Sequence, residues 1–299
     1  MSDFTPQTRN SAIWSGDSRK VATGKANEVI LTKLGRMPIP DLSHIEAVQM
    51  GHVMEPVIAN LAQTKLKVEL KKIEESLTHP KEAWLRSHFD FVGTENGQTI
   101  LVECKNYNAG VRNKFDDIAN TIPNADMAQL IHEATVFGNT RIYLAVLFGG
   151  QEFVLMPFDI TNEQKTNLIK QMAEVWAKVL TKDTFPPEDL EQVKLMYPSD
   201  IPDTFKTASK SVEDACQALR QIKNEIKLLE GREEQLQTFV QAHMEQNSSL
   251  QAVDGSVLAT WKSAKASKKF DPKLFQQSMP DIYEQFVVEV PGSRRFLLK

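Results

Sequence analysis

Two apolar segments separated by a glycine-containing turn constrain this chain more than any other feature of its sequence. The first segment is Ala83–Val92 and the second is Thr99–Lys105, and the five residues Gly93–Gly97 between them include two glycines. Short apolar runs on either side of such a turn predict a β-hairpin. We therefore expect two antiparallel strands joined by a turn at residues 93–97.

Further elements extend this hairpin into a mixed fold. Residues 142–148 and 152–158 flank Gly149-Gly150 and predict a second hairpin. Apolar residues at helical spacing predict helices over residues 46–66, 126–137 and 163–180, the first with a kink or a late start at Pro56. The order of helix, strands, helix, strands and helix predicts an α/β or α+β core with mixed strand directions.

The second strand of the first hairpin carries a candidate active site. Side chains alternate along a strand, so Glu103 and Lys105 share one face and Cys104 points to the other. Asp90 lies near the end of the preceding strand, where antiparallel pairing brings its carboxylate beside Glu103. Two neighbouring carboxylates repel each other unless a cation lies between them, and oxygen ligands suit Mg²⁺ or Mn²⁺. The sequence thus predicts a metal site capable of phosphodiester hydrolysis, with Lys105 beside the attacking water.

A Glu-x-Lys on a strand is by itself more often an exposed cross-strand ion pair than an active site. The apolar residues 100–102 before the pair, and the upstream Asp90, favour the catalytic interpretation.

Residues 9–180 as a whole resemble the phage-type exonucleases, which include lambda exonuclease and the YqaJ-like viral recombinases, within the PD-(D/E)xK nucleases. The resemblance implies a restriction-endonuclease-like core in which helices flank a central mixed β-sheet. The matching segments are Arg9–Asp17, Gly51–Pro56, His79-Pro80, Trp84-Leu85, Ser87–Asp90, Val102–Asn106, Ala128–Leu130, Gly138 and Leu144–Gly150.

The resemblance assigns roles to individual residues. Asp90 and Glu103 would bind the metals, and the backbone carbonyl of Cys104 and the side chain of Glu55 would complete the site. Lys105 would be the catalytic lysine, and Gln129 would support the site or contact DNA. Without the resemblance, Glu55 and Gln129 would be interpreted as surface residues of helices.

The resemblance also implies a site for the 5′-phosphate of a DNA end at Arg9 and Ser15. The guanidinium of an arginine suits a phosphate monoester. The family usually has a serine directly before the first acidic residue of this motif, whereas Gly16 precedes Asp17 here and the nearest hydroxyls belong to Ser15 and Ser18. The alternative for Arg9 is an N-terminal tail without a role.

The function implied is a Mg²⁺-dependent exonuclease that digests linear double-stranded DNA from its ends, 5′ to 3′, and leaves a 3′ overhang for a single-strand annealing protein. Rings of three subunits occur in the family, so a homo-oligomer, a trimer among the candidates, is expected. Two alternatives stay open: an endonuclease or DNA-repair nuclease on the same fold, and a non-catalytic recombination scaffold that binds DNA and a partner.

The amino-acid composition of the chain changes in the stretch before residue 205, where we expect a domain boundary. Prolines at 186, 187, 198 and 202 indicate a linker, and we expect a nuclease domain over residues 1–205 and a helical, basic appendage over residues 206–299. Heptad spacing predicts a long coiled-coil-like helix whose partner is its own chain, another subunit or a different protein. The heptad residues are Val212, Ala215, Leu219, Ile222, Ile226, Leu229, Leu236 and Val240. Residues 257–299 hold eight Lys or Arg against four acids, either a DNA-contacting module or a solvated face.

Net charge and cysteine content limit the classes of protein to which this chain can belong. A net charge of −4 argues against a protein that coats nucleic acid nonspecifically, although a local basic groove suffices for a nuclease. Cys104 and Cys216 are too few for a disulfide framework, which favours a reducing compartment. With no apolar run of membrane-spanning length and no signal-peptide core, we expect a cytoplasmic protein without membrane contact, in the host cell if a phage encodes it.

Overall fold

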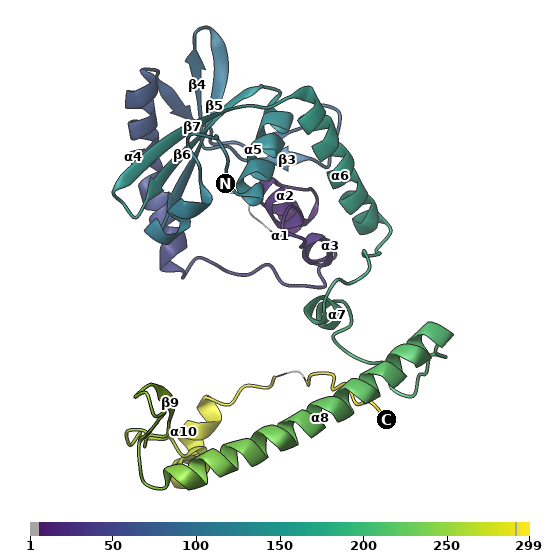
Figure 1. The fold of residues 1–299 in the computed structure, drawn as a ribbon. Coiled ribbons are helices and arrows are strands. Elements are labelled where there is room, and N and C mark those ends of the chain that lie inside the picture. Colours follow the sequence, from purple (N-terminus) through teal and green to yellow (C-terminus); the bar gives the residue numbers. More distant parts are fainter. Residues whose placement is uncertain (1–5, 291) are drawn as a thin grey trace. The chain divides into compact units, whose positions relative to one another are not determined.

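A five-stranded mixed sheet organises the first two thirds of the chain (Figure 1). The strands lie in the order β1-β4-β5-β6-β7; β5 and β6 are parallel, and the other neighbours are antiparallel. This confirms the predicted α/β class with a central mixed sheet flanked by helices. The strands are β1 (Leu70–Lys72), β4 (Phe91–Glu95), β5 (Gln98–Tyr107), β6 (Arg141–Phe148) and β7 (Glu152–Asp159).

The computed structural model describes residues 6–290 and 292–299. It divides into two compact units, Met1–Tyr197 and Pro198–Lys299. The first unit contains the sheet, and the boundary expected near residue 205 falls between its last helix, α7 (Leu190–Met196), and the first helix of the second unit, α8 (Lys210–Met244).

Two helical layers cover the sheet (Figure 1). On one face, α4 (Glu46–Leu66) packs Ile58 and Ala62 onto apolar side chains of β4, β5 and β6. On the other face, α5 (Asn124–Phe137) packs Leu130 and Ala134 onto β5 and β6. Behind α5 lie α2 (Ser15–Val21), α3 (Ala26–Lys33) and α6 (Asn162–Leu180), and α1 (Pro6–Asn10) precedes them.

The predicted helices are present, and local chemistry explains where they begin and end. The hydroxyl of Thr161 accepts a hydrogen bond from the Gln164 backbone N–H and caps the start of α6. Gly138 ends α5 with a left-handed φ of 87°. The helix predicted around Pro56 begins at Glu46 and runs through the proline to Leu66, so it has no late start.

The first predicted hairpin is confirmed, but its turn is shorter than expected. Glu95 pairs with Gln98, so only Asn96 and Gly97 form the turn. Both have positive φ values, 49° and 79°, which suits a tight turn between twisted strands. Gly93 lies inside β4. A glycine suits this position because β1 passes so closely that a Cβ atom there would be 2.8 Å from the Leu70 side chain.

The segment before Asp90 is also different from the prediction. Residues 83–90 do not extend β4; instead β3 (Arg86–Ser87) pairs with β2 (Leu77–Thr78) in a separate small sheet. The backbone of Ile13 also bonds to both Trp84 and Arg86. This part of the chain therefore ties the N-terminal helices to the sheet.

The stretch expected to be a linker, residues 183–203, is structured in part. It contains α7, whose Met196 is buried, and the side chains of Asn27 and Gln192 are joined by a hydrogen bond of 2.9 Å. Because α7 contacts α3, it belongs to the first unit.

The second unit consists of the long helix α8 and several short elements. The predicted helix is confirmed and spans 35 residues. A hairpin of β8 (Ser249–Gln251) and β9 (Val257–Thr260) follows, and then α9 (Pro272–Ser278) and α10 (Pro280–Gln285). Within the described residues, every helix is too short or too polar to cross a membrane.

Candidate active site

The centre of the candidate site is the middle of β5. Glu103 is buried on the face covered by α5, and Lys105 follows on the same face. The ammonium Nζ of Lys105 donates to Glu103 Oε1 at 2.6 Å. Cys104 lies on the opposite face among the apolar residues beneath α4. The alternation expected from the sequence thus holds for all three residues.

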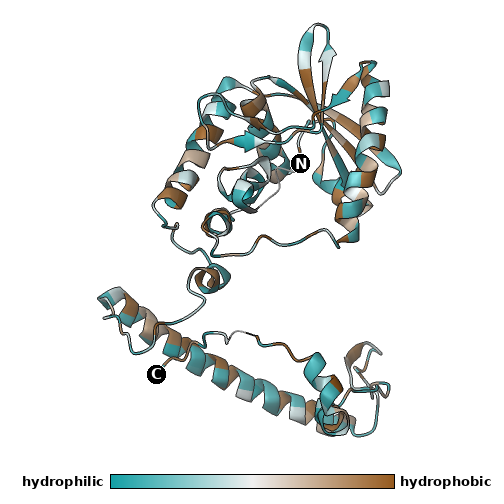
Figure 2. Ribbon diagram, turned by 180° about the vertical axis from the view of Figure 1, so that it is seen from behind, coloured by the Kyte–Doolittle hydropathy of each residue, from teal (hydrophilic) through white to brown (hydrophobic). Residues whose placement is uncertain are grey.

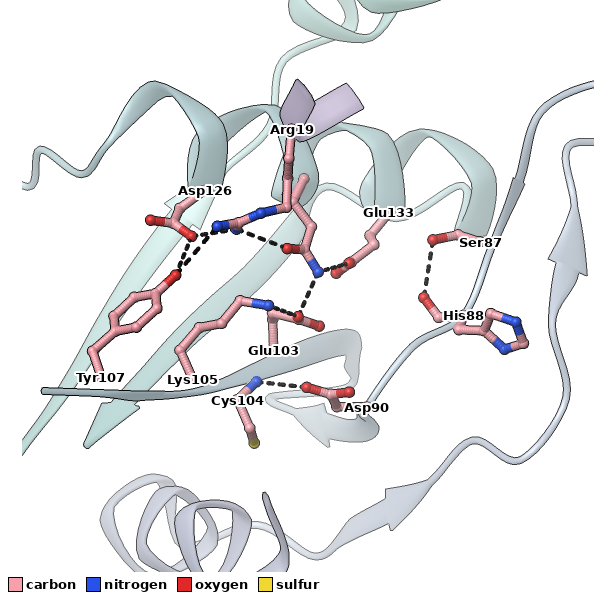
Figure 3. A network of polar contacts seen from close by, with 11 residues as sticks. Arg19, Ser87, His88, Asp90, Glu103, Cys104, Lys105, Tyr107, Asp126 and Glu133 are labelled. Atoms are coloured by element: carbon pink, nitrogen blue, oxygen red, sulfur yellow. Dashed lines mark hydrogen bonds and ion pairs between the residues drawn. The ribbon is translucent and has the colours of Figure 1, made fainter. Parts of the chain in front are cut away.

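Asp90 comes from the residue just before β4. Phe91 pairs with Val102, so Asp90 lies beyond the end of the β4–β5 pairing, on the side toward Glu103. The backbone N–H of Cys104 donates to Asp90 Oδ2 at 2.8 Å (Figure 3). This bond fixes the Asp90 carboxylate against the strand that carries Glu103 and Lys105.

Gln129 reaches the same site from α5. Its amide nitrogen Nε2 donates to Glu103 Oε1 at 2.5 Å and to Glu133 Oε1 at 2.7 Å. Its amide oxygen accepts from the Arg19 guanidinium at 3.0 Å. Both the nitrogen and the oxygen of the Gln129 amide are therefore hydrogen-bonded, and the amide orients the Glu103 carboxylate.

An ion-pair network that the sequence analysis did not predict supports Gln129 (Figure 3). Arg19 of α2 forms an ion pair with Asp126 at the start of α5, and the Tyr107 hydroxyl donates to Asp126 Oδ1 at 2.7 Å. Burial alone would lower the pKa of Arg19, but the Asp126 carboxylate overrides this effect and raises it. Arg19 therefore stays charged and bridges α2 to the site.

Acidic groups outnumber basic groups around Glu103. Burial, reinforced by the Glu103 carboxylate, raises the pKa of Asp90 well above its ordinary value. The same two causes raise the pKa of Glu133. Burial tends to lower the pKa of Lys105, but Glu103 outweighs it and raises that pKa, so Lys105 is the charged partner of the cluster. A cation beside Asp90 and Glu103 would relieve this excess of negative charge.

Glu55 approaches from α4. Its Oε1 accepts from the Lys72 ammonium of β1 at 2.9 Å. Lys72 pairs with Phe91, the residue after Asp90, which places Glu55 near the site. Of the residues assigned to metal binding, three therefore supply carboxylate oxygens to one region of the molecule.

Hard oxygen donors from Asp90, Glu103 and Glu55 suit Mg²⁺ or Mn²⁺. In residues 6–290 and 292–299, no three His, Cys, Asp or Glu side chains converge as a ready-made metal cage. Glu103 is turned toward Lys105 and Glu55 toward Lys72. The donor chemistry and the surplus of negative charge fit a divalent cation, and these two ion pairs would have to loosen to admit it.

Arg9 and Ser15, the positions assigned to the 5′-phosphate, lie in the N-terminal helices α1 and α2. Arg9 belongs to α1 and lines a cavity of about 220 Å³ whose walls include Asp17, Lys20 and Lys33 but neither Asp90, Glu103 nor Lys105. Ser15 is the first residue of α2. The structure thus brings together Asp90, Glu103, Lys105 and Gln129, with Glu55 nearby. The roles of Arg9 and Ser15 stay predictions, and Ser15 lies one helical turn before Arg19 in α2.

Comparisons with known proteins agree with the resemblance seen in the sequence. Residues 8–140 match the YqaJ-like viral recombinase domain, a range that includes every member of the cluster. The resemblance to this family is thereby confirmed over these residues. A full-length relative is the "Uncharacterized protein YqaJ" of Bacillus subtilis (strain 168), 24% identical over 279 residues, which are 91% of this chain and 85% of that protein.

Two solved structures are also similar. One is an alkaline exonuclease, LHK-Exo, from Laribacter hongkongensis, with 13% identity, a TM-score of 0.44, and coverage of 58% of this chain and 92% of that one. The other is a phage-related exonuclease from Haemophilus somnus 129PT, with 11% identity, a TM-score of 0.45, and coverage of 57% and 96%.

Proposed function

We propose that this chain, whose residues 8–140 match the YqaJ-like viral recombinase domain, is a metal-dependent deoxyribonuclease that digests linear double-stranded DNA from its ends. The observation that carries the proposal is the grouping of Asp90, Glu103 and Lys105 at one point of the sheet, with more negative than positive charge. A surplus of buried carboxylates next to a lysine is costly unless it serves a ligand, and the ligand it favours is a divalent cation.

Each residue of the chain has a distinct task in this proposal. Asp90 and Glu103, with Glu55 and the Cys104 carbonyl, would hold Mg²⁺, or Mn²⁺ in its place. When bound, the ion supplies Lewis-acid polarisation of the phosphodiester and lowers the pKa of a coordinated water. Lys105 offsets negative charge that develops on the phosphate, because its raised pKa keeps it protonated. Gln129 keeps the Glu103 carboxylate in place.

The finer features of the proposal follow the resemblance. We propose digestion 5′ to 3′, binding of the terminal 5′-phosphate by Arg9 and Ser15, and delivery of the 3′ overhang to a single-strand annealing protein. Arg9, Lys20 and Lys33 around one cavity give that region a positive charge that suits a phosphate. Asp17 in the same cavity, paired with Lys33 at 2.6 Å, reduces the positive charge there.

The test is digestion of linear and covalently closed circular duplex DNA in Mg²⁺ or EDTA, with the linear DNA labelled at either end and carrying or lacking a 5′-phosphate. The proposal expects metal-dependent loss of linear DNA alone, release of the 5′ label first, and faster digestion of 5′-phosphorylated ends. Cleavage of closed circles would instead indicate an endonuclease. No cleavage of any DNA would leave a recombination scaffold as the function.

A further inference from the structure

In the described part of the second unit, residues 198–290 and 292–299, most of the apolar stripe of α8 is exposed. The stripe consists of Val212, Ala215, Leu219, Ile222, Ile226, Leu229, Leu236 and Val240, which recur at heptad spacing. Its members include side chains that are half exposed or more: Ile222 at 50%, Leu229 at 61% and Leu236 at 68%. Figure 2 shows hydrophobic bands along this largely hydrophilic helix. A long helix with such a stripe is stable when a second helix covers it.

Charged residues on the two flanks of the stripe identify the partner. Lys223 and Glu230 occupy one flank, and Glu225 and Arg232 occupy the other. In a coiled coil these flanking positions meet across the interface and set its orientation. A parallel pair of α8 helices would bring Glu225 against Glu230, two like charges. An antiparallel pair brings each flank against the same flank of the second helix.

In one antiparallel register, each of the four flanking charges meets an opposite charge on the second helix. When Ile226 of one helix lies opposite Leu229 of the other, Lys223 meets Glu230 and Glu225 meets Arg232, and symmetry repeats both pairs. Sliding the helices by one heptad in one direction places Lys223 on Lys223 and Glu225 on Glu225. Sliding them in the other direction places Glu230 on Glu230 and Arg232 on Arg232. Like charges at such positions are destabilising.

We propose that α8 pairs with α8 of a second copy of this chain, antiparallel and with Ile226 opposite Leu229. The same register overlaps the stripe from Ala215 to Val240, because Leu219 then faces Leu236 and Ala215 faces Val240. Glu233, the charged residue within the stripe, lies opposite Ile222 and beside Lys223 of the second copy. The inference rests on α8 alone and does not depend on the proposed nuclease activity.

The surroundings of α8 leave room for the second helix. A groove of about 810 Å³ lies between the C-terminal part of α8 and the β8–β9 hairpin, lined by Leu236, Val240 and Trp261. In the proposed register this groove receives the start of the partner's α8. The C-terminal end of the chain contacts α8 at Arg220, whose guanidinium donates to the Lys299 carbonyl. Arg220 lies outside the stripe, so this contact leaves the stripe free for the partner.

The first test reverses one flanking charge in the full chain and measures the dimer dissociation constant by sedimentation equilibrium. Lys223→Glu turns two attractive pairs into two repulsive ones, so the constant should rise on the order of tenfold. Lys227→Glu, the same change at a position off the interface, should leave it unchanged. The double variant Lys223→Glu/Glu230→Lys should restore wild-type affinity. A monomeric wild type, or failure of the double variant to restore affinity, would overturn the proposal.

The second test reads the orientation directly. In a Cys216→Ser background, Leu219→Cys and Leu236→Cys chains carrying tags of different mass are mixed and oxidised. The antiparallel register predicts a mixed disulfide between the two kinds of chain. Disulfides between identical chains would indicate a parallel pair and overturn the inference, as would the absence of any crosslink while the wild type is dimeric.

Discussion

Replacing Asp90 by asparagine should stabilise the metal-free protein while abolishing its response to metal. The asparagine side-chain oxygen can still accept the hydrogen bond from the Cys104 backbone N–H, so the substitution removes mainly charge. Burial, together with Glu103, raises the pKa of Asp90 above its ordinary value of 3.8. An acid with a raised pKa in the folded state costs stability increasingly as pH rises above its unfolded pKa. The increase in unfolding free energy that Asp90→Asn brings should therefore be large at pH 8 and small near pH 4.

The size of this effect follows from electrostatics. Cβ atoms at facing strand positions lie roughly 5 Å apart. Two unit charges at a separation of about 5 Å repel by about 3 kcal/mol at an effective dielectric constant of about 20. Lys105 offsets part of this repulsion, so we expect a net gain of about 1–3 kcal/mol. In a unit of 197 residues, each kcal/mol moves the melting temperature by about 2–4 °C.

Thermal unfolding in EDTA and in Mg²⁺, at alkaline and at acidic pH, measures both the stabilisation of the metal-free protein and its response to metal. Wild type should gain about 2.7 kcal/mol when Mg²⁺ is present at about one hundred times its dissociation constant. Asp90→Asn should melt higher than wild type in EDTA and gain nothing from Mg²⁺. A lower melting temperature of the variant in EDTA, together with an unchanged Mg²⁺ response, would refute the reasoning.

Three further predictions test other parts of the molecule. Arg19→Lys keeps the charge beside Asp126 but loses the guanidinium hydrogen bond to the Gln129 amide oxygen, so kcat should fall about tenfold with little change in melting temperature. Burial lowers the pKa of His132 from 6.5 to about 4. The contribution of His132 to the unfolding free energy should therefore fall by on the order of 3 kcal/mol as pH falls through this window, and urea titrations of His132→Asn should lack this loss. Gly93→Ala should cost about 1–3 kcal/mol by the same assay, because β1 blocks the added Cβ.

Each of these predictions has a control or an opposing outcome. Gly16→Ala adds a Cβ with no heavy atom within 4 Å and should change stability little compared with Gly93→Ala. If Arg19→Lys lowers the melting temperature clearly as well as kcat, Arg19 acts only as a structural anchor. A pH slope that His132→Asn leaves unchanged would assign the acid sensitivity to other groups.

The sequence predicts the strand that carries the site because alternation is a local property. Glu103, Cys104 and Lys105 need only the period of a strand to be assigned to faces, and the structure agrees. The short turn after β4 has a local signal too, the pair Asn96-Gly97. The place of Gly93 has none, because it lies inside β4 where β1, a short strand earlier in the chain, packs against it.

The support around Glu103 is not local, and most of it was missed. Glu133 follows Gln129 by one helical turn, so helix geometry alone could have placed both on one face. Arg19 and Asp126 lie more than 100 residues apart and meet because α2 packs on α5. No spacing within either segment indicates that contact. Likewise, α7 is a short helix in a proline-rich stretch, and its packing on α3 keeps it in place.

The most direct test of the account is single-turnover digestion of a linear duplex by wild type, Lys105→Ala and Lys170→Ala, an exposed lysine of α6, in Mg²⁺ and in EDTA. The account predicts Mg²⁺-dependent digestion by wild type and Lys170→Ala, and at least a hundredfold slower digestion by Lys105→Ala, on the scale of one lost catalytic group. Digestion that persists in EDTA, or that proceeds equally in Lys105→Ala, would contradict the assignment of the site.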